Sequence, residues 1–520
     1  MIVLARAVPH FFSERVSPER AQEEIKQALA SREQRFLALS REQIYGNPES
    51  PYLKLLRLAG CEFSDLRSEV HRCGLEQTLD RLAQEGVYLT SEEFKGKKEI
   101  VRGRQTLPRV SPSDLEQCHL PAGYQTQSSG TRNDPIRSFV SLDLLAIRTP
   151  ATCVFFTAHD LFSHTQASYD AVLPASGGIN MLMIYAKMGV VAKRWFARTM
   201  PIDNKVERSY HNLMTRLLVN AARRHGPGFP RPEFIATHET DQIVRWAESE
   251  RQQKKGCAIT TAASNAARIA RAALDMGISL EGVKFIVSGE PFTESKRQAI
   301  EKTGATATPR YAQGGGINVG FGCAHPVHTD EVHVSQELLA LISNPRPPQN
   351  GSSPFHPLLC TTLHPSFPRL LLNVESGDYG ELSQRNCGCA LGNAGLSLHL
   401  HHIRSFEKFT SEGMNYFYGD LFELFEKVLP AEFGGGPGDY QLVEEEDSNS
   451  QTRLTLVVHP EVGELNEREL LSRLQKSLEH GARGNSLMSK LWQDTGTFRI
   501  RREIPHASNR GKILPLHISH

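Results

Sequence analysis

The chain has no excess of charge of either sign. Lysine and arginine number 59, aspartate and glutamate number 58, and the formal net charge of the 520 residues is +1. A chain without net positive charge lacks the overall attraction to nucleic acid or to an anionic membrane that basic proteins have. We therefore expect small molecules or proteins as partners, and neither nucleic acid nor membrane.

Long apolar runs are also missing. A membrane-spanning helix needs roughly 18 apolar residues in succession, and the closest stretch, residues 177–191, is interrupted by Asn180 and Lys187. The amino terminus contains Arg6 and His10 and lacks the ordered regions of a signal peptide. The nine cysteines are scattered and odd in number, which fits a reducing compartment better than a disulfide framework. These absences predict a cytoplasmic protein.

The length predicts more than one domain. At roughly 100 to 200 residues per domain, a chain of this size makes two or three units. Residues 1–110 are dominated by charged, helix-favouring sequence, and Ser17 before Pro18 is a typical helix start. Residues 404–520 combine strand and helix patterns and predict a small α+β domain.

Residues 111–403 have the pattern of a parallel sheet. Short apolar runs alternate with helical patterns, which is the order of βαβ units. The expected strands are 152–157, 258–261 and 284–288, and the expected helices are 210–224, 241–250 and 263–276. The predicted fold class is therefore α/β, with a large N-terminal domain that has a helical leader and βαβ sheets, and a small α+β C-terminal domain.

One loop has the composition of a phosphate-binding turn. Residues 127–135 include the hydroxyl side chains of Ser128, Ser129 and Thr131 around Gly130. Hydroxyl groups donate hydrogen bonds, and glycine allows successive backbone N–H groups to point at one anion. An ordinary surface turn has a similar composition, so the loop alone leaves both interpretations open.

A second loop follows a candidate buried strand. Gly289, Glu290 and Pro291 come directly after residues 284–288, and a further short strand leads into Tyr311. Open α/β sheets bind ligands at the carboxyl ends of their parallel strands. We therefore expect this loop at a ligand-binding edge.

Cysteine and histidine residues lie close together in two segments. Cys387 and Cys389 are too near in sequence for a useful disulfide, and Cys323 and His328 suit two ligands on one loop. Three thiolates and one imidazole complete the closed tetrahedral site of a structural zinc ion. His325 is a competing imidazole, and unrelated loop cysteines with surface histidines are the alternative.

Three further groups of polar residues have two interpretations each. Asp378, beside Gly377, could accept two hydrogen bonds from a ribose diol, or be a turn aspartate. Lys512 could hold a carboxylate and a phosphate at once, or be solvated. The cluster from His399 to His402 fits strand and loop positions better than a metal site, because alternate strand residues face opposite sides.

Taken in order, these motifs resemble the adenylate-forming (AMP-binding) superfamily and its phenylacetate–coenzyme A ligase branch, from about residue 110 to the end. The resemblance assigns Ser128, Ser129, Gly130 and Thr131 to the phosphate loop, Gly289, Glu290 and Pro291 to the adenine side, and Tyr311 to the motif that follows; Asp378 matches the ribose-binding aspartate, Arg404 the interdomain hinge and Lys512 the catalytic lysine. Cys323, His328, Cys387 and Cys389 fall where this branch carries a Cys…His…Cys-x-Cys-Gly set, which favours zinc.

The resemblance implies an ATP-dependent ligase with residues 111–403 as its adenylate-binding core. A carboxylate attacks the α-phosphate of ATP to give acyl-AMP and pyrophosphate, and an acceptor then displaces AMP. It implies ATP and Mg²⁺, a small, aromatic or other carboxylic acid, and coenzyme A as the favoured acceptor. An amine or a carrier protein is the alternative acceptor of the acyl group. For the oligomeric state, we consider a homodimer. The resemblance also implies that residues 404–520 form a mobile C-terminal domain, on which Lys512 would serve the first step.

Departures from the family pattern support a second hypothesis. Asn133 and Asp134 stand where glycine and lysine are usual, and Gly315 stands at the position of the magnesium-binding glutamate. Glu290 is the nearest acid that could replace this glutamate. The alternative function is a catalytically degenerate protein that binds an adenylate without turnover.

Overall fold

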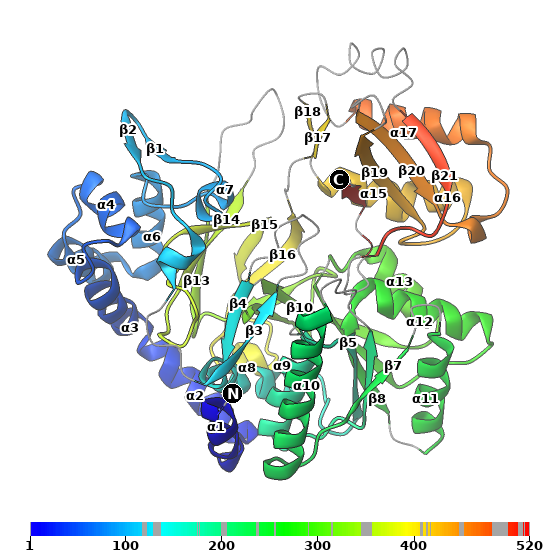
Figure 1. The fold of residues 1–520 in the computed structure, drawn as a ribbon, viewed down its shortest axis with the longest axis horizontal. Helices are drawn as coiled ribbons and strands as arrows, with labels where there is room; N and C mark the ends of the chain where they lie inside the picture. The colour runs from blue at the N-terminus through cyan, green and yellow to red at the C-terminus, as the bar shows by residue number, and fades with distance from the viewer. Residues whose placement is uncertain are drawn as a thin grey trace.

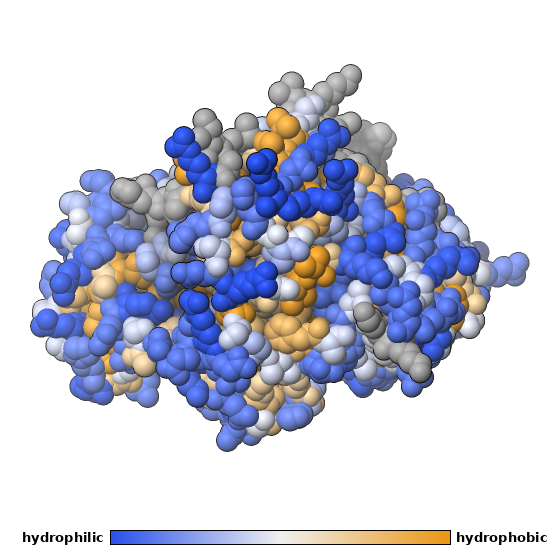
Figure 2. All heavy atoms as spheres, turned by 90° about the horizontal axis from the view of Figure 1, so that it is seen from below, coloured by the Kyte–Doolittle hydropathy of each residue, from blue (hydrophilic) through white to orange (hydrophobic). Residues whose placement is uncertain are grey.

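The computed structural model describes residues 2–116, 122–127, 137–173, 175, 177–198, 205–235, 239–253, 256–289, 291–313, 316–344, 356–405, 409–411, 414–416, 418–446, 452–480, 498–507, 513 and 515–518. Among these, no helix combines the length and the apolar character needed to cross a membrane. Polar residues cover most of the face in Figure 2, with apolar residues in separate patches between them.

Helices form the amino-terminal section, as the charged sequence predicts (Figure 1). They are α1 (Ile2–Ser13), α2 (Pro18–Ala30), α3 (Arg32–Leu39), α4 (Pro51–Leu58), α5 (Phe63–Cys73), α6 (Leu75–Gln84) and α7 (Ser91–Phe94), with a π-helix at Ser40–Tyr45 and the hairpin β1 (Ile100–Arg102) and β2 (Gln105–Leu107). Ser17 caps α2 by accepting a hydrogen bond from the backbone N–H of Arg20 at 3.3 Å. The helical leader is confirmed.

The leader is fixed to the sheet by buried hydrogen bonds. Asn373, which is fully buried, donates from Nδ2 to the carbonyl oxygens of Leu79 (2.8 Å) and Val87 (3.1 Å). The hydroxyl of buried Tyr52 donates to the carbonyl oxygen of Leu370 at 3.2 Å. Because the apolar side chains of both parts belong to one buried cluster, the leader and the sheet form one body.

A twelve-stranded sheet lies at the centre of this body. The order is β13 (Leu339–Ser343), β14 (Pro357–Thr362), β15 (Val374–Gln384), β16 (Leu398–Ser405), β12 (Val332–Val334), β11 (Ile317–Gly322), β10 (Thr306–Gln313), β9 (Val283–Ser288), β8 (Cys257–Ala262), β5 (Thr165–Ala171), β6 (Arg194–Arg198) and β7 (Pro232–Phe234). Strands β10 to β7 in this order pair in parallel, and the others pair antiparallel.

The predicted βαβ units occupy the parallel half of the sheet. Their helices are α9 (Gly177–Lys187), α10 (Lys205–His225), α11 (Asp241–Gln252), α12 (Ala263–Asp275) and α13 (Glu294–Glu301). Strands β8 and β9 lie where the sequence predicts them. Both are buried on both faces, which explains the continuous apolar runs that predict them.

Residues 152–157, which the sequence predicts as a strand, belong instead to helix α8 (Leu142–Ala158). Ser141 starts this helix by accepting a hydrogen bond from the N–H of Leu144 at 3.0 Å. Residues 148–156 are all buried. A helix that is buried on every side has no polar stripe, so its sequence lacks the helical period and is easily taken for a buried strand.

The C-terminal body has its own sheet and core, as predicted. Its strands run in the order β21 (Phe498–Arg502), β20 (Thr452–Val458), β19 (Tyr440–Glu446) and β22 (Leu516–Ile518), and they pack with α15 (Tyr418–Glu423), α16 (Leu429–Phe433) and α17 (Glu467–His480). Figure 1 shows this body next to α12 and α13. The fold class is thus confirmed as α/β with a smaller α+β C-terminal part.

Two ion pairs join the C-terminal body to the large one. The guanidinium of Arg271 on α12 donates to both carboxylate oxygens of Asp439, at 2.9 and 3.1 Å. Lys296 on α13 lies with its Nζ 2.8 Å from Oε1 of Glu426, and the Lys296 side chain is 1% exposed. The second pair is therefore shielded from water, where ionic interactions are strongest and desolvation costs most.

Candidate functional site

Gly289, Pro291 and Tyr311 lie together at one edge of the parallel sheet. Strand β9 ends at Ser288, which pairs with Arg310 of β10, so Gly289 and Tyr311 both follow at the carboxyl ends of adjacent parallel strands. Gly289 has φ +86°, a backbone conformation that favours glycine. The loop after β9 therefore leaves the sheet by a sharp turn at the edge where such sheets bind ligands.

Tyr311 and Asp378 meet across this edge. The Tyr311 hydroxyl donates to Oδ2 of Asp378 at 2.6 Å and accepts from Nε2 of Gln313 at 2.8 Å. Burial and the Asp378 carboxylate raise the pKa of Tyr311 well above its ordinary value, so the hydroxyl keeps its proton and remains a donor. Gly377 has φ +81°, and the backbone N–H of Asp378 donates to Oγ of Ser376 at 3.2 Å. A tight turn thus orients the carboxylate.

Arg404 lies on the strand beside Asp378. In the β15–β16 register, Tyr379 is opposite Arg404 and Asp378 is opposite Ser405. The guanidinium of Arg404 donates from Nη1 to Oδ2 of Asp330 at 2.9 Å. Asp330 also accepts backbone N–H bonds from residues 402 and 403, at 2.9 and 2.8 Å. The end of β16 is therefore anchored just before the chain leaves for the C-terminal body.

The other residues predicted for adenylate binding lie outside the described residues: Ser128, Ser129, Gly130, Thr131, Glu290 and Lys512, together with Asn133, Asp134 and Gly315. The strands that flank the first loop are described. Strand β3 (Gly123–Gln127) pairs antiparallel with β4 (Arg137–Ser141), and Gln127 lies opposite Arg137. The roles of these residues stay predictions.

Three of the four predicted zinc ligands lie together. The Sγ atoms of Cys323, Cys387 and Cys389 and one ring nitrogen of His333 all lie within 4.8 Å of one another. Nε2 of His333 is 3.2 Å from Sγ of Cys389 and 3.5 Å from Sγ of Cys387. Hydrogen bonding to Cys323 lowers the pKa of the Cys389 thiol.

His333, and not His328, is the imidazole of this group. It lies on β12 opposite Phe321 of β11. Phe321 comes two residues before Cys323 in the sequence. Nδ1 of His333 is 2.6 Å from the carbonyl oxygen of Leu396, so Nδ1 carries the proton and Nε2 is left facing the thiols. His333 interrupts a fully buried strand between two valines, and a polar residue in such a strand is the sequence signal that could have identified it.

His328 lies in a separate group with His401 and His402, in which the ligand atoms are also within 4.8 Å of one another. The rings of His328 and His401 stack with centroids 4.1 Å apart. Nδ1 of His402 is 3.0 Å from Oε1 of Glu381. The structure therefore separates His328 from the cysteines that the sequence places close to it, because β12 returns antiparallel to β11 and carries His333 back toward Cys323.

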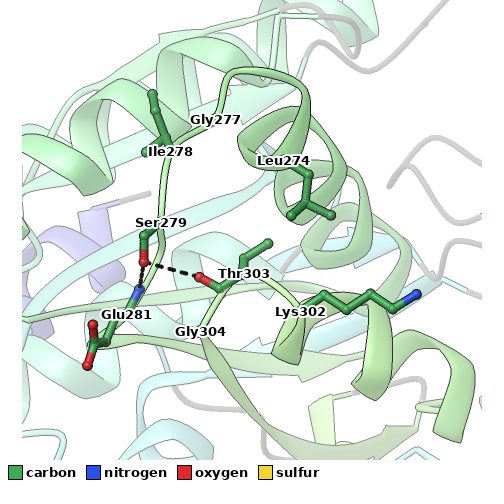
Figure 3. A pocket seen from close by; sticks show the side chains of 8 residues that line it. All are labelled: Leu274, Gly277, Ile278, Ser279, Glu281, Lys302, Thr303 and Gly304. Carbon is green, nitrogen blue, oxygen red and sulfur yellow. Dashed lines mark hydrogen bonds between the residues drawn. The ribbon is translucent and has the colours of Figure 1, made fainter.

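A surface pocket of about 500 Å³ lies on the opposite edge of the sheet (Figure 3). Ser279 and Glu281 line it from the segment before β9, and Thr303 and Gly304 line it from the segment before β10. In Figure 3 the Lys302 side chain points away from the Ser279–Thr303 hydrogen bond. Because this is the amino-terminal edge of the parallel strands, the pocket is remote from Tyr311 and Asp378.

Solved structures of one ligase share the fold of the chain. Two structures of 2-hydroxyisobutyryl-CoA ligase in the postadenylation state are similar, one in complex with R3-HIB-AMP and the other with 2-HIB-AMP. The first has a TM-score of 0.53 at 13% identity and covers 96% of this chain and 89% of its own. The second has a TM-score of 0.52 at 13% identity, with 98% and 91% covered. The sequence matches no protein-family model and no curated protein.

Proposed function

We propose that the protein is an adenylate-forming enzyme that uses ATP to activate a small carboxylic acid as its acyl-AMP. The observation that carries this proposal is the contact between Tyr311 and Asp378 at the carboxyl ends of the strands, within a fold shared with a ligase solved in complex with 2-HIB-AMP. An oriented carboxylate beside a turn suits the two hydroxyl groups of a ribose. The motif order of the sequence supplies the phosphate loop and Lys512.

In the first step, a carboxylate oxygen of the acid attacks the α-phosphorus of ATP. The bond from that phosphorus to the bridging oxygen breaks, and pyrophosphate leaves. Negative charge develops on the α-phosphate, which the N–H and hydroxyl donors of residues 128–131 and the Lys512 ammonium would stabilise. Mg²⁺, which neutralises phosphate charge, would accompany the ATP, with Glu290 as its candidate protein ligand in place of Gly315.

In the second step, a nucleophile attacks the acyl carbonyl, AMP leaves, and the nucleophile loses its proton. We propose coenzyme A as the acceptor, through its thiol, and an amine or a carrier protein as the alternative. The ion pairs of Arg271 and Lys296 hold the C-terminal body in the observed arrangement. If Lys512 serves only the first step, both pairs break when the C-terminal body rotates between steps.

ATP–pyrophosphate exchange with a panel of carboxylic acids tests the proposal. We expect acid-dependent exchange that is lost in Lys512→Ala. Lys476→Ala, a lysine on helix α17 of the same body, is the matched control and keeps the activity. If ATP stabilises the protein against heating but no acid supports exchange, the degenerate adenylate-binding protein is the correct function. If ATP and acyl-AMP mimics do not bind at all, both functions fail.

We also propose a structural zinc ion held by Cys323, His333, Cys387 and Cys389. The donor set fits, because three thiol sulfurs and a nitrogen with a fixed tautomer all lie within 4.8 Å of one another. Zinc would crosslink β11, β12 and the segment before α14 (Ala390–Asn393). Gly392 also suits this arrangement, since a Cβ there would lie 3.2 Å from Sγ of Cys387.

Elemental analysis of the purified protein tests the zinc proposal. We expect about one zinc per chain, as a closed four-ligand site retains its metal. His333→Ala removes the zinc, whereas His328→Ala keeps it, since His328 lies in the other histidine group. Zinc retained in His333→Ala and lost in His328→Ala would contradict the assignment.

A further inference from the structure

Two arginines are buried beneath the proposed adenylate edge and form no ion pair with an acidic residue in the described part of the chain. Arg148 on α8 is 5% exposed and Arg310 on β10 is 7% exposed. Neither forms an ion pair with any of the residues that the structure describes. Arg369, which is 9% exposed, does have one, since it pairs with Glu116 at 3.2 Å. A buried charge without a counter-charge is costly, so the exception requires a reason.

The hydrogen-bonding groups of the pair are also unsatisfied. Nε and Nη1 of Arg148 and Nε of Arg310 have no hydrogen-bond partner within the described part of the chain. Arg310 contacts the Met181 sulfur through Nη1 and bonds the Tyr185 hydroxyl. Asp170 is near enough for its charge to favour the charged form of Arg310 and so to oppose the lowering of the pKa by burial, but the two form no ion pair; Oδ1 of Asp170 accepts the N–H of Ala171 at 2.7 Å.

The two positive charges are close to each other. Burial, together with the charge of Arg310, lowers the pKa of Arg148 to about 9. Asn318 on β11 adds further unsatisfied groups, because its amide oxygen and nitrogen are buried and neither has a partner among the described residues. It lies opposite Ala312, which shares a strand face with Arg310. Buried polar groups that lack partners are expected where a ligand or ordered water completes them.

The location connects these groups to the proposed reaction. Arg310 directly precedes Tyr311 and pairs with Ser288 at the end of β9. Because successive strand residues face opposite sides, Arg310 points away from Asp378 and toward α9. Nη1 of Arg148 lies 3.7 Å from the point that a Cβ on Gly316 would occupy, just after β10. The pair thus lies on the opposite face of the strand that carries the ribose-side tyrosine.

We propose that Arg148 and Arg310 bind a second anionic group on the acid substrate, so that the preferred substrate is a dicarboxylic acid or an acid with a comparable anionic substituent. The inference rests on the proposed function. Guanidinium groups match a carboxylate in geometry and charge, and two of them would hold it by paired hydrogen bonds. A neutral acid would leave both charges buried and unpaired, which is the strongest form of substrate rejection.

Exchange assays with matched acids test the inference. Each dicarboxylic acid is compared with the monocarboxylic acid of equal chain length, such as glutarate with valerate. We expect kcat/KM to be about 100-fold or more higher for the dianionic member, because rejecting a substrate that leaves polar groups unpaired has effects of this size or larger. In Arg310→Met the preference falls at least about tenfold, while KM for ATP is unchanged. Arg369→Met, a paired buried arginine, is the control and keeps the preference.

Calorimetric titration separates this inference from the proposed function. Binding of the dicarboxylate to the full-length protein, lost in Arg148→Met and in Arg310→Met, supports the anion site even if exchange fails. Circular dichroism checks that each variant is folded, and Arg310→Lys, which keeps the charge, retains partial binding. Exchange that favours the neutral acid of each pair, or no dianion binding to the parent protein, overturns the inference. Equal binding of inorganic phosphate would point to a free-anion site and would also overturn it.

Discussion

The buried ion pair between Lys296 and Glu426 makes a quantitative prediction about how the two bodies are held together. Both side chains are nearly inaccessible, at 1% and 6% exposed, and the Nζ–Oε1 distance is 2.8 Å. Nζ of Lys296 also donates to the carbonyl oxygen of Pro291 at 3.1 Å, and Oε2 of Glu426 accepts from the Thr293 hydroxyl. Glu426→Leu therefore leaves a buried ammonium without its counter-charge.

Removing one partner of a buried pair costs about 3 to 5 kcal/mol, whereas replacing both by apolar residues is close to neutral. We expect this loss in Glu426→Leu and in Lys296→Met, and recovery of most of it in the double variant. Urea denaturation followed by circular dichroism measures the free energy of the transition that unfolds the C-terminal body. The double-variant cycle isolates the coupling between the two side chains.

A surface pair provides the control for this cycle. Arg473 and Glu432 form an ion pair of the same 2.8 Å length within the C-terminal body, but their side chains are 35% and 44% exposed. Removing Glu432 should cost less than about 1 kcal/mol, because water screens exposed pairs. If Glu426→Leu costs no more than this control, the pair between the bodies contributes little, and our reasoning about it is refuted.

Two further predictions concern single side chains. Tyr311→Phe removes a donor to the Asp378 carboxylate and should weaken ATP binding about tenfold, or about 1.4 kcal/mol for a hydrogen bond to a charged group. Tyr45→Phe in the leader is the control and leaves ATP binding unchanged. Calorimetric affinities within twofold of the parent for Tyr311→Phe would contradict the assignment. Burial raises the pKa of Glu337 from 4.5 to about 7, so between these pH values the folded state keeps a proton that the unfolded chain releases, and stability falls as pH rises through this window. Glu337→Gln should remove about 3 kcal/mol of the pH dependence of the free energy of unfolding. Denaturation curves measured at pH 5 and pH 8 that shift equally in parent and variant would show that Glu337 does not cause this dependence.

Elements with a clear period or a clear cap were predictable from the sequence. Ser17 marks the start of α2, and the apolar run of β9 with the turn at Gly289 marks the edge of the sheet. Helix α8 was not predictable in this way, because its apolar residues surround the whole helix and leave no period. Local sequence also cannot say which distant segments meet, and the twelve-strand order depends on those pairings.

The candidate site was predictable as a set of segments and not as a set of contacts. Motif order gives Tyr311 and Asp378, but their hydrogen bond depends on strands that are far apart in the sequence. His333 and not His328 lies with the three cysteines because β12 returns antiparallel to β11. Spacing along the chain does not reveal this return. Arg148 and Arg310 have ordinary sequence surroundings, and what distinguishes them is their burial without an ion pair to any acidic residue that the structure describes.

Carboxylate-dependent ATP–pyrophosphate exchange by the purified protein is the decisive assay for adenylation. We expect exchange with at least one acid of a broad panel, dependence on Mg²⁺, and loss of exchange in Lys512→Ala. Binding of ATP without exchange for any acid in the panel would contradict adenylation as the function of this protein.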